Sequence, residues 1–229
     1  MSYILGYIVA DGCIYKRKDR KNSYTLNITS KDKDNLLKMG KNLSLDCSIS
    51  IKYNSQKMPY SQIQICNREM CEDLMSLGIL PRKTSHLELI EVSEKYFPDF
   101  VRGFFDGDGT VYIYNVNGTP QIKAGFISAS LAFLQNINLR ICKALNISFK
   151  KIHQFSPKNK NQRLIRYSID FYVDDCEKLA EFMYRNNPVL YLPRKRKIFE
   201  KWTLIKRRHY IKQNYPSKVG WQLNQKVFA

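Results

Sequence analysis

The sequence predicts an α+β fold of two tandem αββαββα repeats related by a pseudo-two-fold, each with one antiparallel four-stranded, saddle-shaped sheet. Three pairs of similar segments carry this prediction, because they recur in the same order with slowly growing spacing. They are Ile4–Gly12 with Val101–Gly109, Cys71–Leu74 with Cys176–Leu179, and Leu80–Lys83 with the identical Leu192–Lys195. The 229 residues suffice for two such repeats, and an apolar content of 44% can fill their cores.

Each repeat is expected to follow the same order of elements. An apolar segment that ends at Gly12 or Gly109 predicts a buried helix stopped by glycine. The first repeat then continues with strands 12–17 and 23–29, helix 31–43, strands 48–53 and 60–65, and helix 69–77. The second continues with strands 110–115 and 121–127 joined through Asn117-Gly118, helix 131–145, strands 147–155 and 163–171, and helix 174–185.

These elements divide the chain into four expected parts. The first repeat covers residues 1–88, a linker covers 89–98, and the second repeat covers 99–202. A basic tail, 203–229, belongs to neither repeat.

The charge of the chain indicates a polyanionic partner. Its 38 Lys and Arg against 20 Asp and Glu give a net charge of +18, unusual for a metabolic enzyme. Residues 191–229 hold 11 basic residues and 1 acidic residue, so this segment alone contributes +10. The six cysteines lack CxxC spacing and the three histidines lie far apart, which argues against a zinc site. The apolar run 3–10 is too short to span a bilayer, so we expect a soluble, intracellular protein of the cytoplasm, nucleoid or an organelle.

Alternation along the strands predicts one helix-covered face and one open polar face for each sheet. Tyr, Arg, Lys, Gln, Asn and Thr side chains on the open face suit base edges and phosphates of a nucleic acid. An ordinary solvated face is the alternative. The candidate contacts are Tyr15, Arg17, Arg20, Lys21, Thr25, Asn27, Lys52, Gln62, Gln64, Tyr112, Tyr114, Gln121, Lys123, Lys150 and Arg166.

Two aspartates, Asp11 and Asp108, end the two predicted buried helices. The C-terminus of a helix is negative, so a carboxylate there does not stabilise the helix. With the last carbonyls, those of Ala10 and Gly107, these carboxylates offer hard oxygen ligands for Mg²⁺. An ordinary Asp-Gly turn is the alternative for either one alone.

Each of these helices also has a glycine in its interior, Gly6 or Gly103, which costs roughly 1 kcal/mol relative to alanine. If the helices pack against each other at the glycines, both aspartates arrive at one end, where divalent cations would relieve their repulsion.

The two nine-residue segments resemble the paired motifs of LAGLIDADG homing endonucleases, in the monomeric two-motif form. The resemblance covers nearly all of residues 3–202 and implies that Asp11 and Asp108 bind the catalytic metal. It implies two or three Mg²⁺ ions, with Mn²⁺ as a substitute and Ca²⁺ binding without cleavage. The first copy departs from the pattern at Val9, where the second has Asp106, a position that is not the usual metal ligand.

The resemblance also implies a lysine near the scissile phosphate after the third helix of each repeat. Lys83 and Lys195 fit by position and could stabilise the developing charge or help to activate water; a solvated or phosphate-contacting lysine is the alternative. Arg82 and Arg194 are expected to contact phosphates, whereas Ser30 and Ser128 match a polar position beside the site.

The expected function is site-specific, metal-dependent hydrolysis of both strands of a DNA duplex. The resemblance implies a staggered cut with 3′ overhangs in an intron- or intein-associated setting. Two sheets would cover roughly 20 base pairs, and their different open faces favour an asymmetric target. The resemblance to the two-motif form implies a monomeric protein. An RNA-binding maturase and a DNA-binding regulator without nuclease activity are the alternatives.

Overall fold

The computed structural model describes residues 1–16, 23–43, 49–81, 83–157 and 164–214. The first repeat contains α1 (Ser2–Asp11), β1 (Gly12–Lys16), β2 (Tyr24–Ser30), α2 (Lys33–Asn42), β3 (Ile49–Tyr53), β4 (Pro59–Ile65) and α3 (Arg68–Ser76), followed by a 3-10 turn, Lys83–Ser85. The second contains α4 (Phe97–Asp108), β5 (Thr110–Val116), β6 (Thr119–Ser128), α5 (Leu131–Leu145), β7 (Ile152–Phe155), β8 (Arg166–Tyr172), α6 (Val173–Tyr184) and α7 (Pro193–Asn214).

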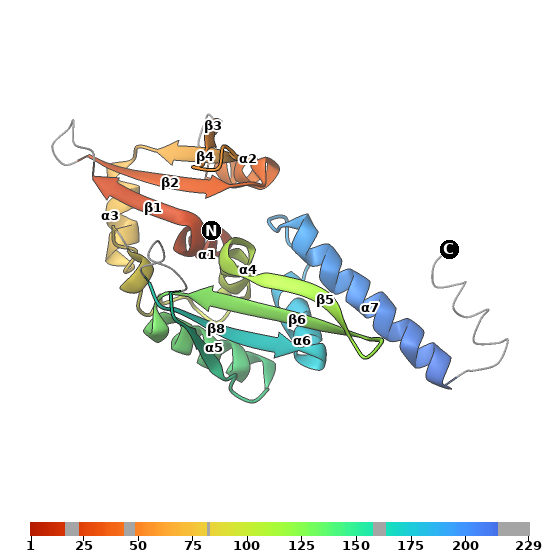
Figure 1. The fold of residues 1–229 in the computed structure, drawn as a ribbon. Coiled ribbons are helices and arrows are strands. Elements are labelled where there is room, and N and C mark those ends of the chain that lie inside the picture. Colours follow the sequence, from red (N-terminus) through yellow and green to blue (C-terminus); the bar gives the residue numbers. More distant parts are fainter. Residues whose placement is uncertain (17–22, 44–48, 82, 158–163, 215–229) are drawn as a thin grey trace.

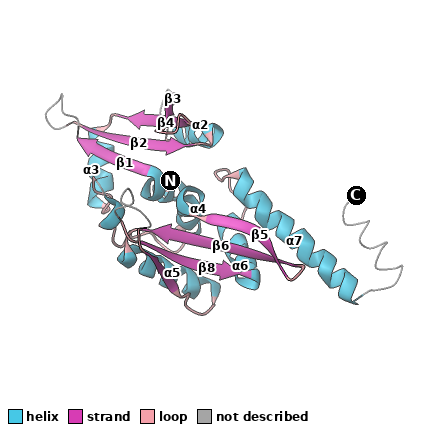
Figure 2. Cartoon of the chain, viewed as in Figure 1, coloured by secondary structure: helices cyan, strands magenta, loops and turns pink. Residues whose placement is uncertain are grey.

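Both repeats form an antiparallel four-stranded sheet with the same topology. The strand orders are β1-β2-β4-β3 and β5-β6-β8-β7, so the predicted α+β fold of two matching repeats is confirmed. The α1–α4 pair lies between the two sheets, and α7 runs outward beside the second repeat (Figure 1). Helices α5 and α6 cover one face of the second sheet (Figure 2).

Local sequence explains where several elements end. Asn117 and Gly118 both have positive φ, 48° and 79°, as a two-residue hairpin turn requires. The Asn67 side chain accepts a hydrogen bond from Met70 N at the start of α3, and Asn146 ends α5 in the left-handed conformation. The inward-facing strand residues form the core, with Leu26, Ile28, Ile122, Ala124, Phe126, Ile169 and Phe171 at 0–1% exposure.

The central contact of the fold is the packing of α1 against α4. A Cβ atom at Gly6 would lie 2.1 Å from the Phe100 carbonyl oxygen, and one at Gly103 would lie 1.9 Å from that of Tyr3. Both distances are far below van der Waals contact, so any side chain would force the helices apart. The interior glycines therefore serve close backbone approach, as the sequence predicts.

The glycines that follow the two helices play a different part from the one expected. Gly12 and Gly109 have φ of −82° and −79°, so neither is a left-handed helix stop. A Cβ at Gly12 would lie 2.6 Å from the Ile8 carbonyl oxygen, and one at Gly109 would lie 2.5 Å from that of Phe105. Glycine is required here because each chain turns directly from helix to strand against its own last turn.

Helix α7 runs without a break across the expected boundary at residue 202. The helix extends to Asn214, Trp202 within it is buried, and the Thr203 hydroxyl donates a hydrogen bond to the Phe199 carbonyl at 3.2 Å. The first part of the expected tail is thus a direct extension of the second repeat.

Gly103→Ala tests the helix crossing. The added methyl group should lower the free energy of unfolding by about 3 kcal/mol through overpacking, despite a gain of about 1 kcal/mol in helix propensity. Urea denaturation measures this change. Gly118→Ala is the control, because its Cβ would meet nothing within 4 Å and only its left-handed backbone costs about 1 kcal/mol. A Gly103→Ala protein as stable as the wild type would contradict the crossing geometry.

Candidate active site and nucleic-acid interface

The crossing of α1 and α4 places Asp11 and Asp108 at the same end of the helix pair. Each is the last residue of its helix. A Cβ at Gly107 would lie 3.4 Å from Asp11 Oδ2 and 2.2 Å from the Ala10 Cβ, so the two helix ends are in contact. Only glycine fits at position 107, which brings the Asp11 carboxylate directly beside the end of α4.

Burial dominates the electrostatics of these carboxylates. Burial and, to a smaller extent, the adjacent Asp11 raise the pKa of Asp108 to about 6 against the opposing charges of Lys83 and Lys195. Burial also raises the pKa of Asp11, with Lys195 and Lys83 as the main opposing charges. Two half-buried carboxylates at adjacent helix ends disfavour their own ionisation, and a bound cation would remove that penalty.

The two lysines of the Leu-Pro-Arg-Lys segments lie buried beside the ends of the same helices. Lys195 Nζ donates to the carbonyl oxygens of Phe105 at 2.5 Å, Asp106 at 2.9 Å and Gly109 at 2.6 Å. Lys83 Nζ donates to the Gly12 carbonyl oxygen at 2.7 Å. Their ammonium groups thus face the negative C-terminal ends of α4 and α1, where a cation is favoured.

Burial moves the pKa of both lysines down. It lowers the pKa of Lys195 to about 8, with Asp106, Asp11 and Asp108 opposing the shift, and it lowers that of Lys83 as well. Neither amine is the freely solvated group that the sequence left open as the alternative, since the two side chains belong to residues only 5% and 9% exposed.

The oxygen atoms at this helix end fit a hard divalent cation. Two carboxylates lie at this end, and Ala10 and Gly107, whose main-chain carbonyls are the expected further ligands, belong to the last turns of the same two helices. Within the described part of the chain, no three His, Cys, Asp or Glu side chains gather as a metal cage. Mg²⁺ is commonly held by one or two carboxylates together with water and substrate phosphate, so the donor set suits it.

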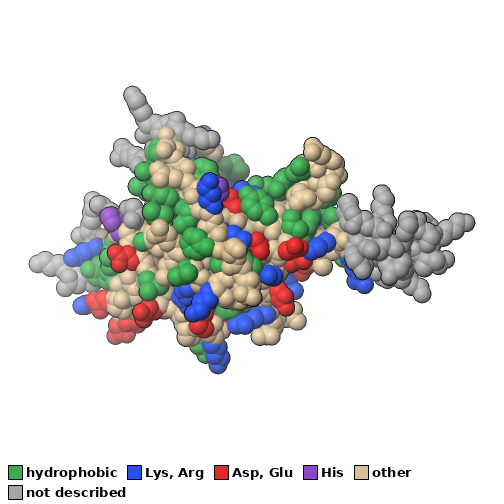
Figure 3. Space-filling view, turned by 90° about the horizontal axis from the view of Figure 1, so that it is seen from below, with side chains coloured by type: hydrophobic (Ala, Val, Ile, Leu, Met, Phe, Trp, Pro, Cys, Tyr) green, Lys and Arg blue, Asp and Glu red, His purple; other side chains and the backbone are tan. Residues whose placement is uncertain are grey.

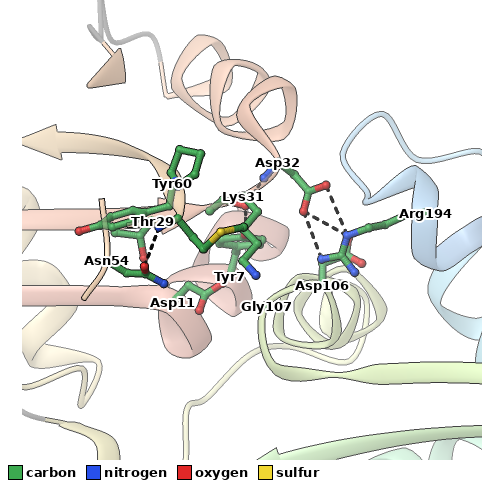
Figure 4. Close-up of a pocket in the computed structure, with 13 residues that line it drawn as sticks. Tyr7, Asp11, Thr29, Lys31, Asp32, Asn54, Tyr60, Asp106, Gly107 and Arg194 are labelled. Atoms are coloured by element: carbon green, nitrogen blue, oxygen red, sulfur yellow. Dashed lines mark hydrogen bonds and ion pairs between the residues drawn. The ribbon is translucent and has the colours of Figure 1, made fainter. Parts of the chain in front are cut away.

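A polar pocket lined by Asp11 and Gly107 lies on the side of the first repeat (Figure 4). Tyr7 OH donates to Ser30 Oγ at 2.8 Å, and Ser30 Oγ also accepts from the Asp32 main-chain nitrogen at 3.0 Å. Asp32 faces Arg194 across the pocket and pairs with it at 3.1 Å. Ser30 thus lies near Asp11, whereas Ser128 accepts from the Ser130 main-chain nitrogen at 3.1 Å.

Asp106 is a buried polar residue of this region that the sequence did not single out. It is 1% exposed, and its Oδ2 accepts from Tyr3 OH at 2.9 Å and from Leu192 N at 2.8 Å. Burial raises its pKa to about 6, with Lys195 as the main opposing charge. The contrast with Val9 at the matching position of the first repeat was the available signal.

The strand pairing places most expected nucleic-acid contacts on the open faces of the sheets. Side chains of paired residues share a face, and Asn27 pairs with Gln64, Tyr112 with Lys123, and Tyr114 with Gln121. By the same alternation Tyr15, Lys52, Gln62 and Arg166 lie on these faces. Lys123 also pairs with Asp170 at 2.8 Å, so this part of the face carries balanced charge.

Two of the expected contacts, Thr25 and Lys150, are not presented to solvent on the open faces in this structure. Thr25 is 0% exposed, because Tyr15 opposite it and the Tyr15–Gln64 hydrogen bond cover it, and its hydroxyl lies 3.6 Å from Cys66 Sγ. Lys150 lies on the helix side of the second sheet, where its Nζ pairs with Asp175 at 2.5 Å and lies over the Phe171 ring. Arg17, Arg20, Lys21 and Arg82 lie outside the described residues.

The face of the molecule seen from below Figure 1 shows Lys and Arg intermixed with Asp and Glu (Figure 3). Within the described residues, no helix is both long and apolar enough to cross a membrane.

Comparing Lys195→Met with Lys83→Met tests the roles of the buried amines in stability. Lys195→Met removes three hydrogen bonds to main-chain carbonyl oxygens, of which that of Phe105 keeps Gly109 N as a donor, and should lower the free energy of unfolding by about 1–3 kcal/mol. Lys83→Met removes one such bond and should cost less. Urea denaturation of both variants checks the order, and an equal or larger loss for Lys83→Met would contradict it.

Comparisons with known proteins place this geometry in a wider context. No model of a protein family matches the chain. An uncharacterized protein of Methanocaldococcus jannaschii is 26% identical over 192 residues, which are 79% of this chain. The match covers only 60% of that protein, so this chain spans less than two thirds of its relative.

Solved structures show stronger likeness in fold than in sequence. I-GzeII in complex with its DNA target is 13% identical with a TM-score of 0.56, over 99% of this chain and 96% of that one. I-DmoI in complex with DNA and Ca is 14% identical with a TM-score of 0.58, over 87% and 96%. The meganuclease I-AabMI bound to uncleaved DNA is 14% identical with a TM-score of 0.57, over 98% and 96%. Two matching repeats around a paired helix crossing thus give this chain the fold of the LAGLIDADG homing endonucleases.

Proposed function

We propose that this protein is a site-specific homing endonuclease that makes a staggered double-strand break in a long, asymmetric DNA target. The observation that carries the proposal is the meeting of Asp11 and Asp108 at one end of the crossed helices, with a buried lysine near each. Its support from other proteins is that neighbours of the same fold, I-GzeII and I-DmoI among them, were solved in complex with DNA.

The proposed reaction is phosphodiester hydrolysis with divalent ions, Mg²⁺ in the first place, held by Asp11, Asp108 and the carbonyls of Ala10 and Gly107. Bound there, the ions would lower the pKa of the attacking water and stabilise the leaving 3′ oxygen. Lys83 and Lys195 would place positive charge next to the phosphates at which negative charge develops. Their low pKa values, caused by burial, bring both amines closer to the range where proton transfer is effective.

The geometry of the aspartates favours a particular cut. Carboxylates at the adjacent ends of two packed helices can span only the minor groove, which is about 6 Å wide. Phosphates that face each other across this groove are offset toward the 3′ side. One centre would then act on each strand and leave short 3′ overhangs. Because both helices of the pair belong to one chain, we propose that a monomer makes both cuts.

The open sheet faces would supply sequence recognition. Tyr, Gln, Asn and Lys side chains on them can reach base edges in the major groove. The two faces differ, with Tyr15 and Gln64 on the first sheet and Tyr112 and Tyr114 on the second, so an asymmetric target is expected.

Asp11→Asn and Asp108→Asn test the nuclease assignment. With Mg²⁺, wild-type protein should cut a duplex from a randomised library that it binds, and each variant should bind the same duplex without double-strand cleavage. Gel assays of cleavage and binding measure both properties. Asp73→Asn, an exposed change on α3, is the matched control and should cut normally. Failure of the wild type to cut any bound duplex would overturn the proposal, and double-strand cleavage at the wild-type rate by either variant would overturn the metal assignment.

Removing residues 205–229 tests whether the basic C-terminal part grips the DNA backbone. Each lost phosphate contact should reduce the slope of log affinity against log salt by about 0.9. Lys206 already pairs with Asp174 at 2.7 Å and Glu177 at 2.9 Å, so other basic residues of this part should account for most of the change. Equal slopes for the truncated and full chains would show that this part does not contact DNA.

A further inference from the structure

The two identical Leu-Pro-Arg-Lys segments lie in different surroundings, although they follow matching helices. Leu192 is 0% exposed whereas Leu80 is 47% exposed. Lys195 lies in the first turn of the long helix α7, whereas Lys83 begins a three-residue 3-10 turn. Lys195 Nζ makes three hydrogen bonds to main-chain carbonyls, and Lys83 Nζ makes one among the described residues. The two segments therefore differ in burial, secondary structure and hydrogen bonding, although their sequences are identical.

Two polar side chains of α4 hold the segment that leads into Lys195. Arg102, 3% exposed, donates from Nε to the Leu190 carbonyl oxygen at 2.9 Å and from Nη1 to that of Met183 at 2.6 Å. Asp106 Oδ2 accepts from Leu192 N at 2.8 Å. The carbonyl oxygen of Leu192 in turn accepts from Lys195 N at 3.1 Å and Arg196 N at 3.2 Å. A single residue, Leu192, thus connects Asp106 to the turn that carries the lysine.

The first repeat has no counterpart of these two anchors. Its matching residues in α1 are Leu5 and Val9, whose side chains cannot form hydrogen bonds. The polar set extends further, because Tyr3 OH donates to Asp106 and accepts from Asn35 Nδ2 at 3.0 Å. The second repeat has Phe100 and Phe133 at the positions that match Tyr3 and Asn35. The residues around Asp106, namely Arg102, Tyr3 and Asn35, are therefore polar. The residues at the matching positions for Val9, namely Leu5, Phe100 and Phe133, are all apolar.

We propose that Asp106 and Arg102 are positioning residues that fix Lys195 through Leu192 and its preceding segment, so that the two cleavage centres are unequal. This inference rests on the proposed nuclease function. Neither residue needs to touch the DNA. Their effect is to hold the start of α7 against α4, so that the Lys195 amine stays at the helix end where Asp11 and Asp108 meet. A displacement of about 1 Å in such a group can cost 100-fold in rate.

Strand-resolved cleavage tests the proposal. A cleavable duplex carries a different label on each strand, and single-turnover rates with Mg²⁺ are measured separately for the two strands. Lys195→Met and Lys83→Met identify the strand that depends more on each lysine. Asp106→Val, which copies Val9, and Arg102→Leu, which copies Leu5, should slow the Lys195-dependent strand roughly 10- to 100-fold and leave the other nearly unchanged. Nicked duplex should then accumulate.

Two further variants distinguish a loss of Lys195 positioning from a general loss of stability. Asp106→Asn can place its carbonyl oxygen where Oδ2 lies and keep both hydrogen bonds, so it should stay within about threefold of wild type on both strands. Asn138→Ala removes a buried side chain of α5 that bonds Lys150, and it should destabilise the second repeat without changing the strand ratio. Equal slowing of both strands by Asp106→Val, or slowing of the Lys83-dependent strand, would overturn the proposal. Asp106→Asn as slow as Asp106→Val would overturn it too.

Amide hydrogen exchange gives a readout that does not depend on cleavage. The amides of Leu192, Lys195 and Arg196 should exchange roughly 10-fold or more faster in Asp106→Val and Arg102→Leu than in wild type or Asp106→Asn. Unchanged protection in Asp106→Val would refute the positioning role. If the wild type cuts no DNA, the nuclease function fails, but this exchange measurement still decides whether Asp106 positions the segment.

Discussion

The close approach of α1 and α4 is the constraint on which the rest of the structure depends. With Gly6 and Gly103 at the crossing, main chain packs directly on main chain, and only then do the helix ends meet. A third glycine, Gly107, admits Ala10 and Asp11 at that end. The sheets extend from the same two helices, because β1 begins at the residue after Asp11 and β5 begins two residues after Asp108. Helix spacing therefore sets both the distance between the carboxylates and the placement of the two sheets.

This arrangement concentrates negative charge, and buried cations balance it. Two carboxylates lie at the negative ends of two helices, which raises the free energy of their ionised forms. Lys83 and Lys195 offset part of this charge through their hydrogen bonds to main-chain carbonyls. Under the proposed function, this site would take up divalent ions and the phosphates of DNA, and its helices are too tightly packed to separate in response to the repulsion.

Much of the fold could be predicted from the sequence, because the same order of elements occurs in both repeats. Repeated segments fixed the element order, alternation separated inward from outward strand residues, and Asn117-Gly118 located a turn. Helix 131–145 was predicted at the bounds observed for α5. These features depend on local spacing, which a sequence displays directly.

Features that depend on tertiary surroundings were missed or mispredicted. Thr25 lies in the polar register of its strand, but a neighbouring hydrogen bond covers it. Lys150 follows a polar pattern, yet Asp175 from a distant helix draws it to the helix side. The role of Asp106 depends on a main-chain nitrogen 86 residues away, which no local pattern reveals. For the same reason, two identical Leu-Pro-Arg-Lys segments gave no sign of their unequal burial.

In the proposed function, the helix crossing builds one divalent-metal site from both repeats. A crystal structure of the protein with a bound DNA target and Mn²⁺ tests it most directly, through the anomalous scattering of the metal. The close approach of α1 and α4 predicts anomalous peaks within coordination distance of both Asp11 and Asp108. Peaks elsewhere in the protein, or none beside these two carboxylates, would contradict it.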